Sequence, residues 1–410
     1  MSKALITQSY LTNIASSIRT KLGVQTTYTP SQMSGAIDSI PSGGDDTEFI
    51  KVVEGGASSV TLPSGATRIK GYLFNYDTSL QTLDMPNSVT EIGIYAFYGC
   101  TNLGLTSLSS GITNISKSAF YNCSNLALTS LPSGVTSIGN NAFQNCTNLA
   151  LTSLPSGITS ISDYTFSGCT NLALTSLPSN VTSIGQYAFQ NCKNLALISL
   201  PSGVTSIGQY AFQKCTNLAL TSLPSGITSL GYDVFNGCTN LALTSLPSGL
   251  TSIGYETFKD CTNLALTSLP SGVTSLGQYA FQNCTNLALT SLPSGITSIP
   301  ASAFNNCTSL ALTSLPSGVT SIGEYAFLHC KSLAITKIPS GVTNIKESGF
   351  SNCTGLTSIT FEGKPTTIHG GSFIGCTNLT TINVPWSSGA VSGAPWGATN
   401  ATINYNYTPT

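Results

Sequence analysis

Charged side chains are scarce in this chain of 410 residues. Lys and Arg number 14, Asp and Glu number 15, and the formal net charge is −1. Because binding to a phosphate backbone requires a basic face, nucleic acid is not an expected partner. No run of about 18 apolar residues occurs, so we also expect no membrane insertion. The exposed surface must consist largely of serine, threonine, asparagine and glutamine.

Histidine is rarer still, with His329 and His369 as the only two. They are far apart in the sequence, and no order of carboxylate, histidine and nucleophile accompanies them. The chain also lacks a glycine-rich loop of the kind that holds phosphates. We therefore expect no enzymatic activity and no cofactor.

Cysteine, in contrast, is abundant and regular. Each of the thirteen cysteines lies 23 residues from the next, from Cys100 to Cys376. A fixed period of this length indicates one supersecondary unit copied many times, and each copy buries its apolar face only by stacking on its neighbours.

The cysteine spacing also bears on redox and metal chemistry. An odd number of cysteines cannot pair completely, and in-register parallel side chains have poor disulfide geometry. No Cys-x-x-Cys pair or nearby histidine pair supplies the spacing of metal ligands. A redox or metal site is therefore the weaker alternative, and we expect buried, reduced thiols with no disulfide and no metal.

One repeat, residues 146–168, shows how each copy is built. Its apolar positions fit neither a long strand nor a long helix. We predict a short strand at residues 149–151, a turn at 155–157, a second extended piece at 158–161 and about one helical turn around Phe166.

The repeat resembles a known family. Residues 142–146 read Ala-Phe-Gln-Asn-Cys, and Leu154 is followed by Pro155. This pattern resembles the BspA-type leucine-rich repeats over about residues 57–386, which implies a solenoid of short parallel strands and turns. Asp77 takes the place of cysteine in an earlier copy, so we expect about fourteen coils over residues 47–385.

Residues 1–46 differ from the repeat. Apolar residues fall on one face of a predicted helix at 8–22, and a second predicted helix begins at Pro30 before a linker at 41–46. The stretches 11–15 and 28–33 resemble N-terminal segments of tail and other structural proteins in phages and prophages of Gram-positive gut bacteria. The resemblance implies docking to virion proteins; a cap on the first coil is the alternative.

The first residues also bear on localisation, because polar residues interrupt them before an apolar segment of the secretory type develops. We therefore expect synthesis in the cytoplasm without a signal peptide. The protein would then occur in the virion tail, or outside the cell after lysis.

Both tryptophans lie in residues 386–410, which depart from the repeat. We expect this segment to cap the open end of the stack, because terminal repeats must cover apolar core and unpaired strand edges. The alternative makes Trp386 and Trp396 a platform on which sugars stack. Residues 394–403 also resemble the ends of phage-encoded repeat proteins, which favours the cap.

Differences between the copies concentrate five or six residues before each cysteine. Tyrosine recurs there beside Gln, Asn, Asp or Glu, which are side chains that suit sugars. The plainer interpretation is that exposed positions change freely and that tyrosine covers the next coil. The candidate ligand-binding residues are Tyr164, Tyr187, Tyr210, Tyr232, Tyr255, Tyr279 and Tyr325.

Threonine and asparagine also recur in columns. A second candidate surface, expected on the concave face, comprises Thr152, Thr175, Thr221, Thr244, Thr267 and Thr290. Another threonine column runs from Thr136 to Thr320, and both columns also suit exposed strand positions. A regular array of hydroxyls can also bind an ordered polysaccharide or ice, of which ice is the weaker interpretation because alanine occupies the neighbouring column. Asparagines from Asn102 to Asn286 suggest side-chain amides that bond along the stack.

Three classes of function follow from these observations. The first is a phage or prophage tail adhesin that recognises a host-surface glycan or protein. The second is a bacterial surface adhesin of the BspA type. The third is a structural spacer or self-assembling fibre, in which the neutral columns would form contacts between copies of the chain.

Overall fold

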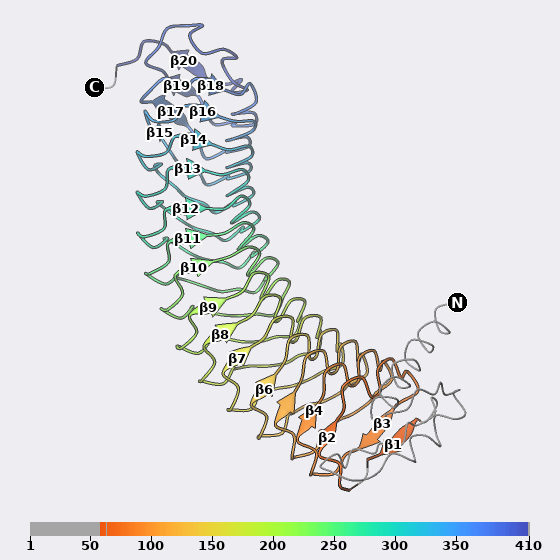
Figure 1. Ribbon diagram of the computed structural model, residues 1–410. Coiled ribbons are helices and arrows are strands. Elements are labelled where there is room, and N and C mark those ends of the chain that lie inside the picture. Colours follow the sequence, from red (N-terminus) through yellow and green to blue (C-terminus); the bar gives the residue numbers. More distant parts are fainter. Residues whose placement is uncertain (1–57, 63, 409–410) are drawn as a thin grey trace, which may run out of the picture.

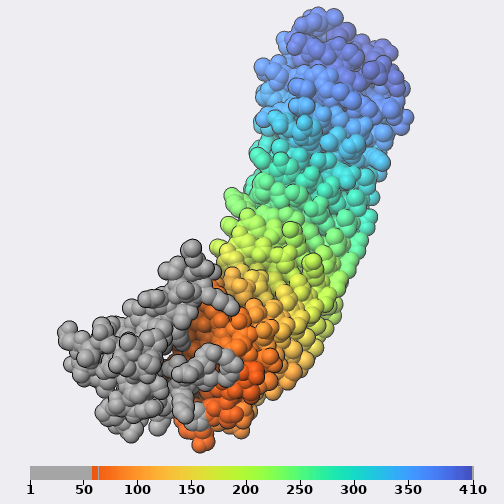
Figure 2. All heavy atoms as spheres, turned by 90° about the vertical axis from the view of Figure 1, so that its right-hand side faces the viewer, coloured from red at the N-terminus to blue at the C-terminus, as the bar shows by residue number. Residues whose placement is uncertain are grey.

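The computed structural model describes residues 58–62 and 64–408. They form one row of stacked coils that bends into an arc (Figure 1). The coils number about 15, so the predicted repeat solenoid is confirmed with one turn more than expected. Figure 2 shows the colours following one another in sequence order along the arc. Each coil therefore packs mainly on the coils before and after it.

One column of short parallel strands runs through the whole row. Successive strands pair in register at the 23-residue period, as Ile161 does with Ile184. The column is divided into four sheets, β2-β4-β5-β6, β7-β8-β9, β10-β11-β12 and β13-β14-β16-β18. Its members are β2 (Arg68–Ile69), β4 (Glu91–Ile92), β5 (Asn114–Ile115), β6 (Ser137–Ile138), β7 (Ser160–Ile161), β8 (Ser183–Ile184), β9 (Ser206–Ile207), β10 (Ser229–Leu230), β11 (Ser252–Ile253), β12 (Ser275–Leu276), β13 (Ser298–Ile299), β14 (Ser321–Ile322), β16 (Asn344–Ile345) and β18 (Thr367–Ile368).

A second column of strands forms only towards the two ends of the row. It contains β1 (Ser59–Thr61) paired with β3 (Thr82–Asp84), and the sheet β15 (Lys337–Ile338), β17 (Ser358–Phe361), β19 (Thr381–Asn383) and β20 (Thr402–Asn404). The strand predicted at residues 149–151 is absent, although Leu149 and Leu151 are buried as expected. Two exposed residues separate Leu151 from Leu154, which breaks the alternation that a half-buried strand requires.

The described residues also contain no helix, so the helical turn predicted around Phe166 is wrong. The chain instead makes a tight turn with two left-handed residues, such as Tyr187 (φ 55°) and Asn191 (φ 59°). The amides of Tyr187, Phe189 and Asn191 donate to carbonyls of the next coil at 2.8–2.9 Å. Because each amide bonds to the next coil, the turns stack as regularly as strands.

The core is a ladder of phenylalanines and cysteines. Rings from Phe74 to Phe373 stack at centroid distances of 5.1–5.7 Å. All thirteen cysteines are buried, as expected, and each is a free thiol in this structure. Each thiol lies near the carbonyl oxygen of the phenylalanine 26 residues earlier, as Cys215 does with Phe189 at 2.9 Å. The thiol thus fills space and adds a weak second donor to a carbonyl that already accepts a backbone amide, as that of Phe189 does from Cys192 at 3.0 Å.

The C-terminal segment lies at one end of the arc, where β20 pairs with β19 (Figure 1). Trp386 and Trp396 are buried, and their rings lie 5.3 and 6.2 Å from the ring of Phe361. The indole Nε1 of Trp396 donates to the carbonyl of Ser392 at 2.8 Å. Because both rings are enclosed, they do not form a sugar platform, and the alternative interpretation of this segment is wrong.

The two helices expected in residues 1–46 lie outside the described residues. Within the part of the chain that the structure describes, no helix is long and apolar enough to cross a membrane.

Candidate functional site

The candidate tyrosines divide into two groups with different geometry. In the first group the rings stack face to face, with centroids 4.5 Å apart for Tyr164 and Tyr187 and 4.4 Å for Tyr187 and Tyr210. Tyr187 thus has a ring on each face. A sugar could reach its edge and hydroxyl, but not its face.

In the second group, two tyrosines lie six residues before the cysteine of their copy and not five. Tyr232 and Tyr255 precede the left-handed position, which Asp233 and Glu256 occupy instead. The rings meet edge to face, at 6.1 Å for Tyr232 and Tyr255 and at 5.6 Å for Tyr255 and Tyr279. Tyr232 is 52% exposed and Tyr255 is 37% exposed. These rings therefore remain open to a ligand.

Backbone conformation shows which tyrosines the fold itself favours. A side chain in the left-handed region costs roughly 1–2 kcal/mol, and Asn or Asp adopts it more readily than tyrosine. Ring stacking offsets about 0.5–1.5 kcal/mol of that cost in the first group. Tyr325 has φ 55° and is 36% exposed, yet within the described residues it makes no ring contact. Stacking does not explain tyrosine at that position.

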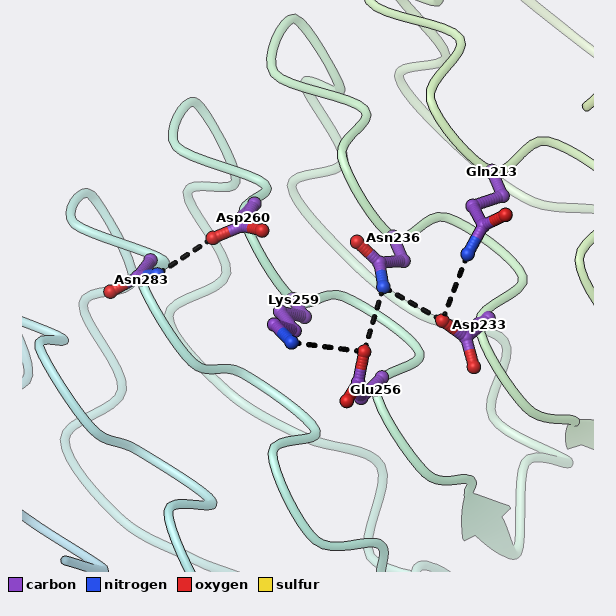
Figure 3. Close-up of polar contacts among 7 residues, drawn as sticks. All are labelled: Gln213, Asp233, Asn236, Glu256, Lys259, Asp260 and Asn283. Carbon is purple, nitrogen blue, oxygen red and sulfur yellow. Dashed lines mark hydrogen bonds and ion pairs between the residues drawn. The ribbon is translucent and has the colours of Figure 1, made fainter. Parts of the chain in front are cut away.

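A chain of polar side chains follows the tyrosines from coil to coil. Gln190 Nε2 donates to Gln213 Oε1 at 2.7 Å, and Gln213 Nε2 donates to Asp233 Oδ1 at 3.1 Å. Asn236 Nδ2 then bridges Asp233 Oδ1 at 2.7 Å and Glu256 Oε2 at 2.9 Å (Figure 3). Lys259 completes the chain through an ion pair of 3.1 Å with Glu256.

Lys259 also connects this network to the tyrosines. Its Nζ lies 5.6 Å from the centroid of the Tyr279 ring, within the range of a cation–π contact. In the neighbouring coils Asn283 Nδ2 donates to Asp260 Oδ1 at 2.7 Å (Figure 3). The amides and carboxylates beside the tyrosines are therefore largely engaged with one another.

Asp233 is the most buried carboxylate of this network, because only 4% of the residue is exposed. Burial raises its pKa above the ordinary value, and the negative charge of Glu256 adds to the rise, while the hydrogen bond from Asn236 opposes it. A carboxyl whose folded pKa lies above its unfolded pKa stabilises the fold fully only below the unfolded value. Its contribution is lost as pH rises through the raised pKa.

Asp233→Asn should therefore raise the melting temperature at neutral pH, by the equivalent of about 1 kcal/mol, because burying a neutral amide costs less than burying a carboxylate and its oxygen can still accept both hydrogen bonds. Near pH 3 the variant and the parent protein should melt alike. Thermal unfolding followed across pH measures the difference, with Asp163→Asn as a control at a less buried carboxylate. A variant that is less stable at neutral pH would contradict this account.

A second tyrosine cluster lies in the first coils. Tyr98 stacks on Tyr121 at 4.5 Å and meets Tyr76 edge to face at 5.1 Å. Tyr95 stacks on Tyr72 at 5.0 Å and lies 5.4 Å from Tyr98. Burial, together with a hydrogen bond to Tyr76, raises the pKa of Tyr98 to about 12, so its hydroxyl remains protonated.

These five tyrosines line a pocket of about 490 Å³ together with Asn75, Lys117, Ser118, Asn141 and Gln144. This cluster is not among the residues predicted from the sequence: Tyr72 and Tyr95 stand in the predicted column, five residues before Asp77 and Cys100, but the candidate tyrosines began only at Tyr164. Tyr98 and Tyr121 lie two residues before a cysteine, and tyrosine at that place in two successive copies was the available signal.

The threonine columns behave differently from each other. Thr152 and its counterparts are exposed, but the strand on which their concave placement depended does not form, so that placement stays a prediction. In the other column, hydroxyls such as those of Thr182, Thr251 and Thr320 donate to carbonyls of the preceding coil at 3.1–3.4 Å. That column supports the stack.

The predicted asparagine ladder has a different basis. Asn102 Nδ2 donates to the carbonyl of Thr78 at 2.8 Å and not to another amide. Bonds between amides join residues one position before the cysteines, namely Asn145 to Asn122 at 2.8 Å and Asn306 to Asn283 at 3.1 Å. Since these positions are left-handed, asparagine suits both the backbone and the ladder.

The two histidines lie apart. His329 is exposed, and His369 Nδ1 accepts a hydrogen bond from the amide of Gly371 at 3.2 Å. Within residues 58–62 and 64–408, no group of three or more His, Cys, Asp or Glu side chains could hold a metal ion.

Two solved structures resemble this chain. A leucine-rich cell surface protein from Faecalibacterium prausnitzii A2-165 is 31% identical, with a TM-score of 0.52 over 76% of this chain and 89% of the other. A leucine-rich repeat protein from Bacteroides ovatus ATCC 8483 is 26% identical, with a TM-score of 0.57 over 85% of this chain and 83% of the other. None of the curated proteins compared with the chain matches it.

The family model described as a BspA type leucine rich repeat region of six copies matches residues 54–173, 159–288 and 286–392. These matches cover most of the solenoid, and they agree with the Ala-Phe-x-x-Cys and Leu-Pro segments of the repeat. The chain therefore belongs to the BspA-type leucine-rich repeat family.

Proposed function

We propose that this protein is a non-enzymatic adhesin whose exposed tyrosines bind a glycan or protein on a host surface. The observation that carries the proposal is Tyr325, which is exposed, left-handed and, within the described residues, without a ring partner. The fold does not account for tyrosine there, whereas contact with a ligand does. Tyr232 and Tyr255 offer similarly open rings in other coils.

Repetition supports binding by these weak individual sites. An aromatic ring contacts the C–H groups of a sugar or an apolar side chain, and several such sites on one rigid row act together. Linked weak sites raise avidity by about 10² to 10⁴ without any strong single contact. Since the net charge of the chain is only −1, attachment should depend little on ionic strength.

Display on a bacterial surface is the first proposed location. The Faecalibacterium prausnitzii protein, which is 31% identical, is described as a cell surface protein. Incorporation into a phage or prophage tail is the second candidate, and it rests on the resemblance within residues 1–46. Antibody labelling of intact cells and of purified virions distinguishes the two locations. A signal on neither would favour the structural spacer or self-assembling fibre.

Replacing Tyr232, Tyr255 and Tyr325 together by alanine should reduce attachment to host cells or to a glycan array by at least about tenfold, because three open rings are lost from one multivalent surface. Tyr187→Ala is the matched control, since it removes a ring whose faces are covered by Tyr164 and Tyr210. Attachment is measured at low and high salt on folded variants.

The proposal fails if the triple variant attaches as well as the parent protein. It also fails if Tyr187→Ala reduces attachment as much as the triple variant does, because the effect would then follow from the coil and not from the open rings. Attachment that salt alone abolishes would contradict recognition by a neutral surface.

A further inference from the structure

The pocket in the first coils is a gap in the tyrosine column. Five residues before the cysteine, successive coils carry Tyr95, Ser118, Asn141 and Tyr164. Where tyrosines follow without interruption, the rings of this column fill the space between coils at 4.4–4.5 Å. Ser118 and Asn141 stand at two positions of the column where other coils carry a tyrosine ring. Both residues line the pocket of about 490 Å³.

The gap is bordered by aromatic rings. Tyr98 and Tyr121 stack face to face within 3° of parallel, so that each ring covers one face of the other. Tyr95 lines the same pocket from the coil that precedes Ser118. A pocket with several aromatic rings and a few polar groups is the usual form of a small-molecule site.

One polar group of the pocket lacks a hydrogen-bond partner. Asn75 Oδ1 is buried without a hydrogen-bond partner, although a buried amide oxygen normally has one. Asn141 and Gln144, which are hydrogen-bonded to each other, bring two further amides to the lining. Lys117 is the single charged residue of the lining, which contains no carboxylate.

We propose that this pocket binds one pyranose ring of a glycan, with preference for a ring that carries a carboxylate. The face of Tyr121 that Tyr98 does not cover contacts the C–H groups of the sugar, and the amides hydrogen-bond its hydroxyls. Lys117 pairs with the carboxylate. The choice of a glycan rests on the proposed adhesin function, but the site is separate from the open tyrosines Tyr232, Tyr255 and Tyr325.

Ser118→Tyr tests the pocket by restoring the missing ring. Tyrosine already occupies this position in other coils, so the backbone accepts it. Ser302→Tyr is a closely matched control, because Ser302 has the same φ of 53° and the same 4% exposure as Ser118 but lies in a gap between Tyr279 and Tyr325. Both variants are made in the full chain and checked by thermal unfolding.

Titration calorimetry with methyl glucuronide and methyl glucoside measures binding. The parent protein and Ser302→Tyr should bind both sugars, the glucuronide more tightly, and Ser118→Tyr should bind at least about tenfold more weakly. Lys117→Gln should remove the preference for the glucuronide. If Ser118→Tyr does not fold, Tyr121→Ala takes its place and should also lose binding.

The proposal is overturned if the parent protein binds neither sugar, or if Ser118→Tyr binds as well as Ser302→Tyr. Equal binding of the two sugars by the parent protein would refute the role of Lys117. Because soluble sugars are used, these results are independent of cell attachment by the open tyrosines. The adhesin proposal could therefore stand if the pocket fails, and the pocket could stand if the adhesin proposal fails.

Discussion

Phe212→Ala should destabilise the solenoid by about 3–5 kcal/mol, the usual cost of deleting a fully buried phenylalanine side chain. Phe212 is buried and stacks on Phe189 at 5.4 Å and on Phe235 at 5.6 Å. Its loss opens a cavity that the two neighbouring rings border, and stacked backbone turns leave little freedom to close it.

The unfolding curve should also change shape. Each coil of a solenoid contacts mainly its neighbours, so a weak coil in the middle separates the row into two cooperative parts. Calorimetry or circular dichroism should then show two transitions where the parent protein shows one. Gln209→Ala, at an exposed position of the same coil, is the control. A single transition, with the free energy of unfolding lowered by less than about 1 kcal/mol, would show that the phenylalanine ladder is not the main core.

All thirteen thiols should be unreactive in the native protein and fully reactive after unfolding. The thiolate is the reactive form, and burial raises the pKa of Cys100 to about 12 and that of Cys376 to about 11. Burial raises the pKa of the central cysteines, such as Cys192, well above the ordinary value. At neutral pH almost no thiolate is present, and the reagent reaches it only when a coil opens.

A chromogenic thiol reagent measures this difference in native and denatured samples prepared without reductant. We expect a native count near zero and a denatured count of thirteen. Cys376, in the last cysteine-containing coil and the least shifted of the series, should react first. A denatured count well below thirteen would reveal disulfides, and rapid native labelling of Cys192 would contradict its burial.

Function was less accessible from the sequence than fold. The seven candidate tyrosines share a place in the repeat, but only their contacts separate the stacked Tyr187 from the open Tyr232 and Tyr325. The polar chain from Gln190 to Lys259 likewise joins residues of several coils. Contacts of this kind depend on side-chain direction, which the spacing of residues in one copy does not specify.

The sequence by itself determined the solenoid, its period, its family and the burial of its cysteines. The reason is that a 23-residue repeat brings equivalent residues into register, so an apolar position in one copy predicts a buried ladder in all copies. The extended piece predicted at 158–161 contains the strand Ser160–Ile161, but the tertiary structure alone decided that residues 149–151 form no strand, although Ala150 still donates a backbone hydrogen bond to Leu128 of the preceding coil. The tertiary structure also decided that a tight turn with two residues of left-handed conformation replaces the expected helical turn, since alternate amides of that turn bond to the next coil. The pocket has the same origin: Ser118 and Asn141 create it only because neighbouring coils place tyrosines around them.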